Sequence, residues 1–178
     1  SAGDGNNEIY GDGDNDEITS GIGNDTISAG DGDDTVNSGR GSDTITAGDG
    51  ADTVKGGGGD DVIGGGLGND VLYGEGDNDT ISGDEGDDTI YGVDGIDTLS
   101  GGSGNDKIYA EAGLSSTIRG DSGDDVLTGG AGTDNISGGD DNDVITAGAG
   151  NDVLTGGNGS DTISGEDGDD EVEDIGRQ

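Results

Sequence analysis

The sequence predicts an all-β protein in which short parallel strands stack as the coils of a solenoid. Three observations support this: a nine-residue unit recurs nineteen times between residues 2 and 173, each copy has one large aliphatic residue, and the first half of each copy is rich in glycine. A fixed short period is typical of a solenoid rather than of a globular domain. The 45 glycines among 178 residues also argue against helices.

The register of the repeat is set by its aliphatic residue, which we place eighth in the unit. The intervals are all nine residues, except for the ten residues from Ile108 to Ile118. The eighth places are Ile9, Ile18, Ile27, Val36, Ile45, Val54, Ile63, Leu72, Ile81, Ile90, Leu99, Ile108, Ile118, Leu127, Ile136, Ile145, Leu154, Ile163 and Val172.

The residue types within a unit divide it into a turn and a strand. In residues 101–109, six turn-forming residues precede Lys107, Ile108 and Tyr109. Glycine permits positive φ values in a tight loop, and aliphatic or β-branched residues favour a strand with one side chain inward. Each unit should therefore reverse the chain once. Two units should complete a coil of eighteen residues, which gives two facing parallel sheets of three-residue strands around a thin aliphatic core.

The charge of the chain is extreme. Five Lys and Arg residues oppose 43 Asp and Glu residues, for a formal net charge of −38. Such a chain repels itself, and its composition alone is typical of disorder. Nineteen buried aliphatic side chains stabilise less than the ordering of the backbone costs. Something outside the sequence must therefore supply stability.

The same composition excludes several classes of function. Five scattered cations cannot hold a phosphate backbone, so we expect no nucleic-acid partner. No Cys or His is present, which removes thiolate chemistry and the commonest general base. We find no apolar run of membrane-spanning length and no N-terminal signal segment, and the chain opens within the first unit, as an excerpt of a longer protein would.

Acidic residues also follow the repeat, because an aspartate stands two residues before the aliphatic in seventeen of nineteen copies. Asn7 and Ser116 are the two exceptions. Stacking at eighteen residues would align these aspartates in two rows. One edge carries Asp25, Asp43, Asp61, Asp79, Asp97, Asp134, Asp152 and Asp170, and the other carries Asp16, Asp34, Asp52, Asp70, Asp88, Asp106, Asp125, Asp143 and Asp161.

Rows of like charge predict a bound cation. A hard divalent ion between successive carboxylates would reverse the repulsion, and carbonyls freed by glycine turns would complete its ligands. Calcium fits best, since it accepts six to eight oxygens in flexible geometry. Ten loops on one edge and nine on the other leave seventeen gaps, which is the ceiling. Three gaps are bounded by Asn7 or Ser116, so we expect roughly fourteen good sites.

The unit resembles the GGxGxDxUx nonapeptide of the RTX (repeats-in-toxin) family, where U is a large aliphatic residue. The resemblance covers essentially the whole chain. It implies a right-handed parallel β-roll with calcium in both turn edges, type I secretion from Gram-negative bacteria, and folding only outside the cell. We therefore expect the protein to be secreted, either extracellular or at the bacterial cell surface. The resemblance also implies that the sixth-place aspartates are side-chain ligands.

Several positions depart from the pattern. Asp14, Asp77 and Asp141 replace the fourth-place glycine and would need the same positive φ, at some strain. Residues 110–119 have lost the aspartate and gained one residue, which suggests a bulged coil with a defective metal position. Residues 174–178 leave the pattern and would form a boundary or a truncated cap.

Three functions remain open at this point. The first is a calcium-folded structural module of a secreted adhesin or toxin. The second is the RTX portion of a secreted enzyme, such as a protease, lipase or polysaccharide-modifying enzyme, whose catalysis would lie elsewhere, because no acid–base pair is distinctive among so many carboxylates. The third is a ligand-binding or ice-binding face built from outward threonines. We expect no enzymatic activity in this chain.

Two further surface features carry expectations. We expect Tyr10, Tyr73, Tyr91 and Tyr109 to pack at edges rather than to form a sugar platform. Uncapped parallel edges could pair end to end, so self-association of an isolated block is the one protein partnership that the sequence suggests.

Overall fold

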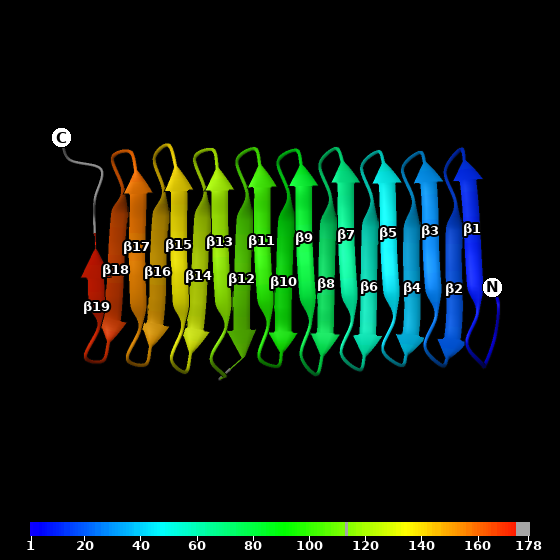
Figure 1. The fold of residues 1–178 in the computed structure, drawn as a ribbon, viewed down its shortest axis with the longest axis horizontal. Coiled ribbons are helices and arrows are strands. Elements are labelled where there is room, and N and C mark those ends of the chain that lie inside the picture. The colour runs from blue at the N-terminus through cyan, green and yellow to red at the C-terminus, as the bar shows by residue number, and fades with distance from the viewer. Residues whose placement is uncertain (113, 174–178) are drawn as a thin grey trace.

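The computed structural model describes residues 1–112 and 114–173 and shows a flat, two-layered coil (Figure 1). Sheet A contains ten strands: β1 (Glu8–Gly13), β3 (Thr26–Asp31), β5 (Thr44–Asp49), β7 (Val62–Leu67), β9 (Thr80–Glu85), β11 (Thr98–Ser103), β13 (Thr117–Ser122), β15 (Asn135–Asp140), β17 (Val153–Asn158) and β19 (Glu171–Glu173). Sheet B contains nine strands: β2 (Glu17–Ile22), β4 (Thr35–Arg40), β6 (Thr53–Gly58), β8 (Val71–Gly76), β10 (Thr89–Asp94), β12 (Lys107–Ala112), β14 (Val126–Ala131), β16 (Val144–Ala149) and β18 (Thr162–Asp167).

The strands pair as the repeat predicts. Each strand lies parallel to the strand two copies later, with residues eighteen apart side by side, as in Thr26 with Thr44 and Ile27 with Ile45. In Figure 1 the strands of sheet A run upward in front and those of sheet B run downward behind, while the chain advances from right to left. The coil is therefore right-handed. The described residues contain no helix, and hence none that could cross a bilayer.

The strands are longer than the sequence suggested. The prediction of three-residue strands is wrong, because each full strand has six residues and continues through the first three places of the next copy. The reason lies in the first place, which is Gly, Ala or Ser in every copy. A small side chain there can turn inward beside the aliphatic, as Ala29 does two residues after Ile27.

The interior is a single file of aliphatic side chains between the two sheets. The eighth-place residues from Ile18 to Leu154 form one buried cluster with Ala29, Ala47, Ala110 and Ala147. Ile9 and Ile163 are only partly buried, and the side chain of Val172 is 53% exposed. The core is one side chain thick, so no residue is far from a turn.

The turns use left-handed backbone at the second and fourth places of most units. Asp14, Asp77 and Asp141 adopt φ values of 72°, 73° and 76°, which confirms that they take the conformation of the fourth-place glycine. Seven further non-glycine residues with positive φ stand at the second place, which the sequence analysis did not anticipate: Asp12, Glu75, Asp84, Val93, Glu111, Asp121 and Glu166. Only Val93 among them is β-branched, with φ 81°, and such residues are rare in this region.

The irregular copy does not interrupt either sheet. Leu99 pairs with Ile118 and Ile108 with Leu127, nineteen residues apart, and the offset returns to eighteen beyond them. Ala112 keeps its register with Asp94, so the extra residue is taken up after it. Gly113 and the expected boundary at residues 174–178 lie outside the described residues.

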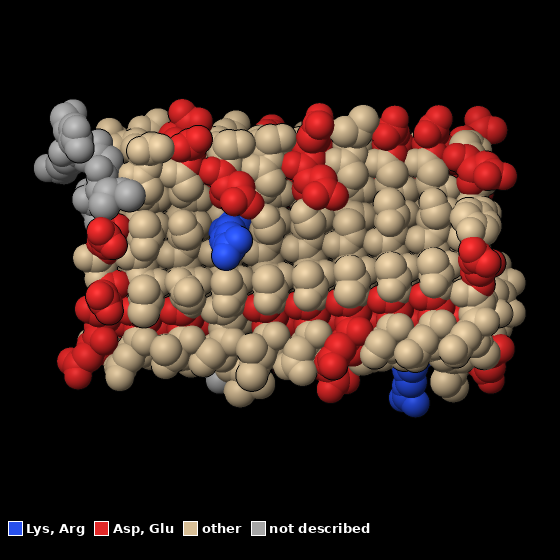
Figure 2. Space-filling view, viewed as in Figure 1, with Lys and Arg blue, Asp and Glu red and all other residues tan. Residues whose placement is uncertain are grey.

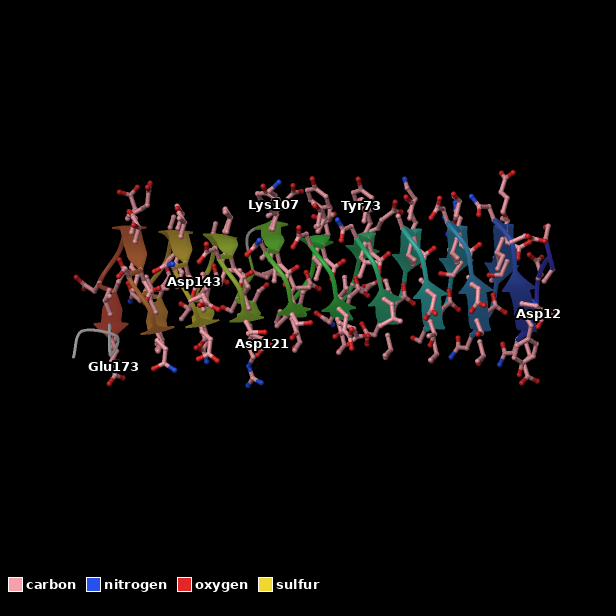
Figure 3. The ribbon with its side chains drawn as sticks, turned by 90° about the horizontal axis from the view of Figure 1, so that it is seen from above. Asp12, Tyr73, Lys107, Asp121, Asp143 and Glu173 are labelled. Atoms are coloured by element: carbon pink, nitrogen blue, oxygen red, sulfur yellow. The ribbon has the colours of Figure 1, made fainter. Side chains whose placement is uncertain are left out.

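Three tyrosines form a ladder on the outer face of sheet B. The ring centroids of Tyr73 and Tyr91 lie 4.8 Å apart and those of Tyr91 and Tyr109 5.2 Å apart, in stacked geometry. Lys55 Nζ lies 5.5 Å from the Tyr73 ring centroid and 3.4 Å from Glu75 Oε1. Figure 3 shows Tyr73 and Lys107 projecting from the same face. The prediction of edge packing is wrong for these three tyrosines. Their ring faces meet one another, which does not suit sugar stacking.

Val93 provides a test of backbone strain. Replacement of Val93 by Gly should raise the free energy of unfolding by about 1 kcal/mol, because glycine adopts the left-handed φ of this position without the strain of a β-branched side chain. The measurement is guanidinium unfolding in saturating calcium. Val71→Gly, at an exposed-face strand position without positive φ, is the matched control and should destabilise by about 0.5–1 kcal/mol. Equal destabilisation by both changes would contradict the assignment.

Candidate metal centre

The sixth-place aspartates lie immediately before the strands, along the two long edges of the coil. From Asp25 to Asp152 their side chains are buried, each at most 2% exposed. In Figure 2 those that precede the strands of sheet A form a red row along its lower edge, interrupted once over β13. All seventeen predicted residues therefore occupy the two rows that the spacing placed them in.

From Asp25 onward, one oxygen of each carboxylate accepts a backbone N–H from the preceding coil. The N–H of Asp61 donates to Oδ1 of Asp79 at 2.9 Å, and the N–H of Asp79 donates to Oδ1 of Asp97 at 2.9 Å. The same bond recurs along both edges, as from Asp70 to Asp88 at 2.8 Å. Charge-assisted hydrogen bonds therefore link the successive aspartates of each row. The repeat predicted only repulsion between these carboxylates.

The other oxygen has no donor. Within the described residues, Oδ2 is buried and lacks a hydrogen-bond partner in Asp16, Asp25, Asp34, Asp43, Asp52, Asp61, Asp70, Asp79, Asp88, Asp97, Asp106, Asp125, Asp134, Asp143, Asp152 and Asp161. A buried acceptor without a donor is costly and rarely left so in native proteins. The repetition of the same orphan atom in nearly every coil indicates a positively charged ligand.

Burial perturbs the acidity of these groups. It raises the pKa of Asp79, Asp88 and Asp125 to about 7, although a backbone N–H donated to each carboxylate partly opposes the shift. Neighbouring carboxylates on the same edge raise these pKa values further. Asp25 differs: burial raises its pKa, but hydrogen bonds from Ser20 and Asn7 outweigh that effect and lower the pKa below its ordinary value.

Backbone carbonyls supply further oxygens to the gaps between coils. A methyl group on the fourth-place Gly68 would collide with the carbonyl oxygen of Gly50 in the preceding coil, and one on Gly86 would collide with that of Gly68. At the first place, a methyl group on Gly65 would meet both Asp70 Oδ2 and the carbonyl of Gly83. Glycine therefore keeps open the space into which these oxygens point.

This donor set fits calcium. No three acidic side chains converge among the described residues, so a cation must take most of its ligands from carbonyls. One or two carboxylate oxygens with several carbonyls is the hard, flexible oxygen environment that calcium accepts, whereas softer metals prefer nitrogen or sulfur. The sixth-place aspartates and the glycine carbonyls of each loop would hold the ion, which would neutralise the carboxylates and cross-link successive coils.

A second ladder lies at the fifth place and was missed in the sequence. The N–H of Asn105 donates to Oδ1 of Asp87 at 2.8 Å, and the N–H of Asp124 donates to Oδ1 of Asn105 at 2.8 Å. These bonds run from the later coil to the earlier one, opposite to those of the sixth place. The signal was present, since Asn or Asp stands at the fifth place in thirteen of nineteen copies.

Ser116 weakens one row. Its Oγ accepts the N–H of Asp97 at 3.4 Å, longer than the bonds between aspartates, and it has no second oxygen for a cation. Its own N–H still donates to Asp134 Oδ1 at 2.7 Å. The opposite edge is unbroken, with Asp106 donating to Asp125 Oδ1 at 2.8 Å.

Fold and site together define a parallel β-solenoid whose turns bind a hard cation. The model of the RTX calcium-binding nonapeptide repeat (4 copies) matches residues 1–27, 18–45, 28–63, 37–72, 56–90, 64–99, 91–113, 115–145 and 137–172. The chain belongs to this family, and its repeats are calcium-binding. RTX repeats occur in secreted bacterial proteins. Comparison with the curated proteins finds no match.

The raised pKa values predict how the calcium-stripped protein responds to pH. Asp79 and its neighbours titrate near pH 6–7 in the fold, against 3.8 for the ordinary group. Between these values the folded chain holds protons that the unfolded chain has lost, so stability of the metal-free fold is lost as pH rises through that window. Stripped protein should therefore show more β structure by circular dichroism at pH 5.5 than at pH 8.

The control for this measurement is the same titration in saturating calcium. There the β content should fall as the pH is lowered, because protons compete with the ion for the carboxylates. Sedimentation velocity at each pH should verify that the gain is not aggregation near the sequence pI of about 4.1. Equal or smaller β content at pH 5.5 in monomeric, stripped protein would contradict the role assigned to the buried carboxylates.

Proposed function

We propose that this chain is a calcium-dependent folding module of a larger bacterial exoprotein exported by type I secretion. The module is disordered in the calcium-poor cytosol and folds outside the cell, where it serves as a rigid spacer and folding element of an adhesin or toxin. The single observation that supports this most strongly is the buried, donor-free Oδ2 atom repeated in nearly every coil.

The charge explains why folding should depend on calcium. With a net charge of −38, collapse of the metal-free chain brings carboxylates together in two buried rows. Each divalent ion removes two of these charges and links two coils, so binding free energy becomes folding free energy. Extracellular calcium modules are tuned to affinities of about 10⁻⁴–10⁻³ M, which suits folding only after export.

The shape supports a spacer role. Each coil contacts only its neighbours, and the two sheets run the whole length of the described chain (Figure 1). Such a rod is extended and stiff, and the described residues form no pocket. We propose that the chain itself is not catalytic. If the parent protein is a protease, lipase or polysaccharide-modifying enzyme, its chemistry lies in another domain.

Circular dichroism of the stripped and calcium-loaded protein tests this proposal. A disordered spectrum should convert cooperatively to a β spectrum as calcium is added, with a midpoint of about 10⁻⁴–10⁻³ M, and magnesium at equal ionic strength is the control. Calcium bound per chain, from equilibrium dialysis, should be roughly fourteen and not exceed the seventeen gaps. Full β structure in excess chelator at pH 8 would contradict the proposal.

A second candidate function rests on the outer face of sheet A. From β3 to β11 its seventh and ninth places carry no charge and hold Thr26, Thr44, Val62, Thr80, Thr98 with Ser28, Thr46, Gly64, Ser82 and Ser100. Figure 2 shows this band as uncharged residues between acidic edges. A flat lattice of hydroxyl groups at strand spacing, about 4.8 Å, interrupted only at β7 within this band, could order water or bind ice.

Ice-crystal shaping distinguishes this candidate from the plain spacer. Calcium-loaded protein should facet growing ice, and Thr80→Arg, at an exposed position in the centre of the band, should abolish faceting while leaving the calcium-induced β spectrum unchanged. Thr35→Arg, at an exposed position on sheet B, is the matched control. Unshaped, round crystals in the wild-type protein would remove this function.

A further inference from the structure

The gap between Asn7 and Asp25 differs from every gap bounded by two aspartates. Asn7 Nδ2 lies 3.0 Å from the carbonyl oxygen of Gly3, 2.6 Å from that of Gly5 and 3.1 Å from Oδ1 of Asp25. The N–H of Asn7 also donates to Asp25 Oδ1 at 2.7 Å. The amide group thus sits among two loop carbonyls and the carboxylate of the next coil.

The chemistry of these partners fixes the orientation of the amide. Carbonyl and carboxylate oxygens only accept hydrogen bonds, so the nitrogen and not the oxygen of Asn7 must face them. A sixth-place aspartate cannot act in this way, because an ionised carboxylate has no donor. Fourth-place carbonyls and sixth-place carboxylates are the kinds of oxygen that would ligate calcium elsewhere, and Asn7 contacts one of each, together with the second-place carbonyl of Gly3.

We propose that the Asn7 amide takes the place of calcium in this gap and links β1 to β3 without a metal ion. The inference rests on the proposed function, in which the gaps between aspartates need calcium. The sequence suggested only that Asn7 weakens a site. The structure instead assigns it a positive role, since the polarised NH2 group satisfies the carbonyl oxygens of Gly3 and Gly5 and Oδ1 of Asp25, while Oδ2 of Asp25 keeps no donor.

The electrostatics of the gap agree with this assignment. Asn at this place leaves one carboxylate, that of Asp25, where a gap between two aspartates has two. The repulsion that calcium must offset elsewhere is therefore reduced, and a neutral donor suffices. The link between the first and third copies should persist at calcium concentrations that leave the other gaps empty.

Hydrogen exchange with mass spectrometry on stripped full-length protein tests the inference. In the wild type, amides of residues 7–27 should exchange more slowly than those of residues 61–81. The second segment covers the equivalent strands, β7 to β9, and its gap is bounded by two aspartates. Asn7→Asp should remove this difference, accelerating exchange of residues 7–27 about tenfold, as loss of hydrogen bonds to a charged group predicts. Saturating calcium should restore protection, because the variant completes an ordinary gap.

A matched pair of variants in the middle of the coil extends the test. Asp61→Asn should create an amide link toward Asp79 and slow exchange of residues 61–81 in stripped protein, whereas Asp61→Leu should not. Unchanged exchange in both Asn7→Asp and Asp61→Asn would overturn the inference. If stripped wild-type protein proves protected throughout, the proposed function fails, but Asn7→Asp must still lose protection locally for the inference to stand.

Discussion

The structure depends on one constraint: the coils bury carboxylates in which one oxygen accepts a hydrogen bond from the protein and the other does not. Oδ1 of Asp79 accepts a backbone N–H from Asp61, while Oδ2 has no donor. The N–H bond alone favours stacking, and the second oxygen opposes it until a cation arrives. Calcium dependence is therefore built into the carboxylate itself.

Other features of the repeat follow from this arrangement. Glycines at the first and fourth places leave carbonyl oxygens unobstructed beside the carboxylate, as at Gly65 and Gly68. The core can be one side chain thick because it need not stabilise the fold alone. Strain at residues such as Val93 is tolerated, since neighbouring coils on both sides fix the backbone of each turn.

Much of this could be read from the sequence, because a strict period converts directly into register. Ile27 beside Ile45 and the two rows of aspartates follow from stacking at eighteen residues. Strand length could not be found in this way, since Ala29 looks like part of a turn until its inward orientation is known. The fifth-place ladder was missed because Asn and Asp in loops are usually explained by turn propensity.

The tyrosine ladder and the Asn7 link were beyond reach for a different reason. Tyr73, Tyr91 and Tyr109 recur at eighteen residues in the sequence, but their mutual stacking depends on side-chain rotamers. Asn7 reads as a lost ligand in the alignment of copies. Only the positions of the carbonyls of Gly3 and Gly5 reveal that a donor is useful there.

The opposed directions of the two ladders give the rod a chemical polarity. At the sixth place each coil offers an N–H to its successor, as Asp88 does to Asp106, and at the fifth place it offers a side-chain oxygen, as Asp87 does to Asn105. The surface that a coil turns forward is thus complementary to the surface that the next coil turns backward, and the two surfaces differ. Contact of two blocks front to back would continue both ladders, whereas contact front to front would continue neither, so an assembly that extended the repeat would be vectorial.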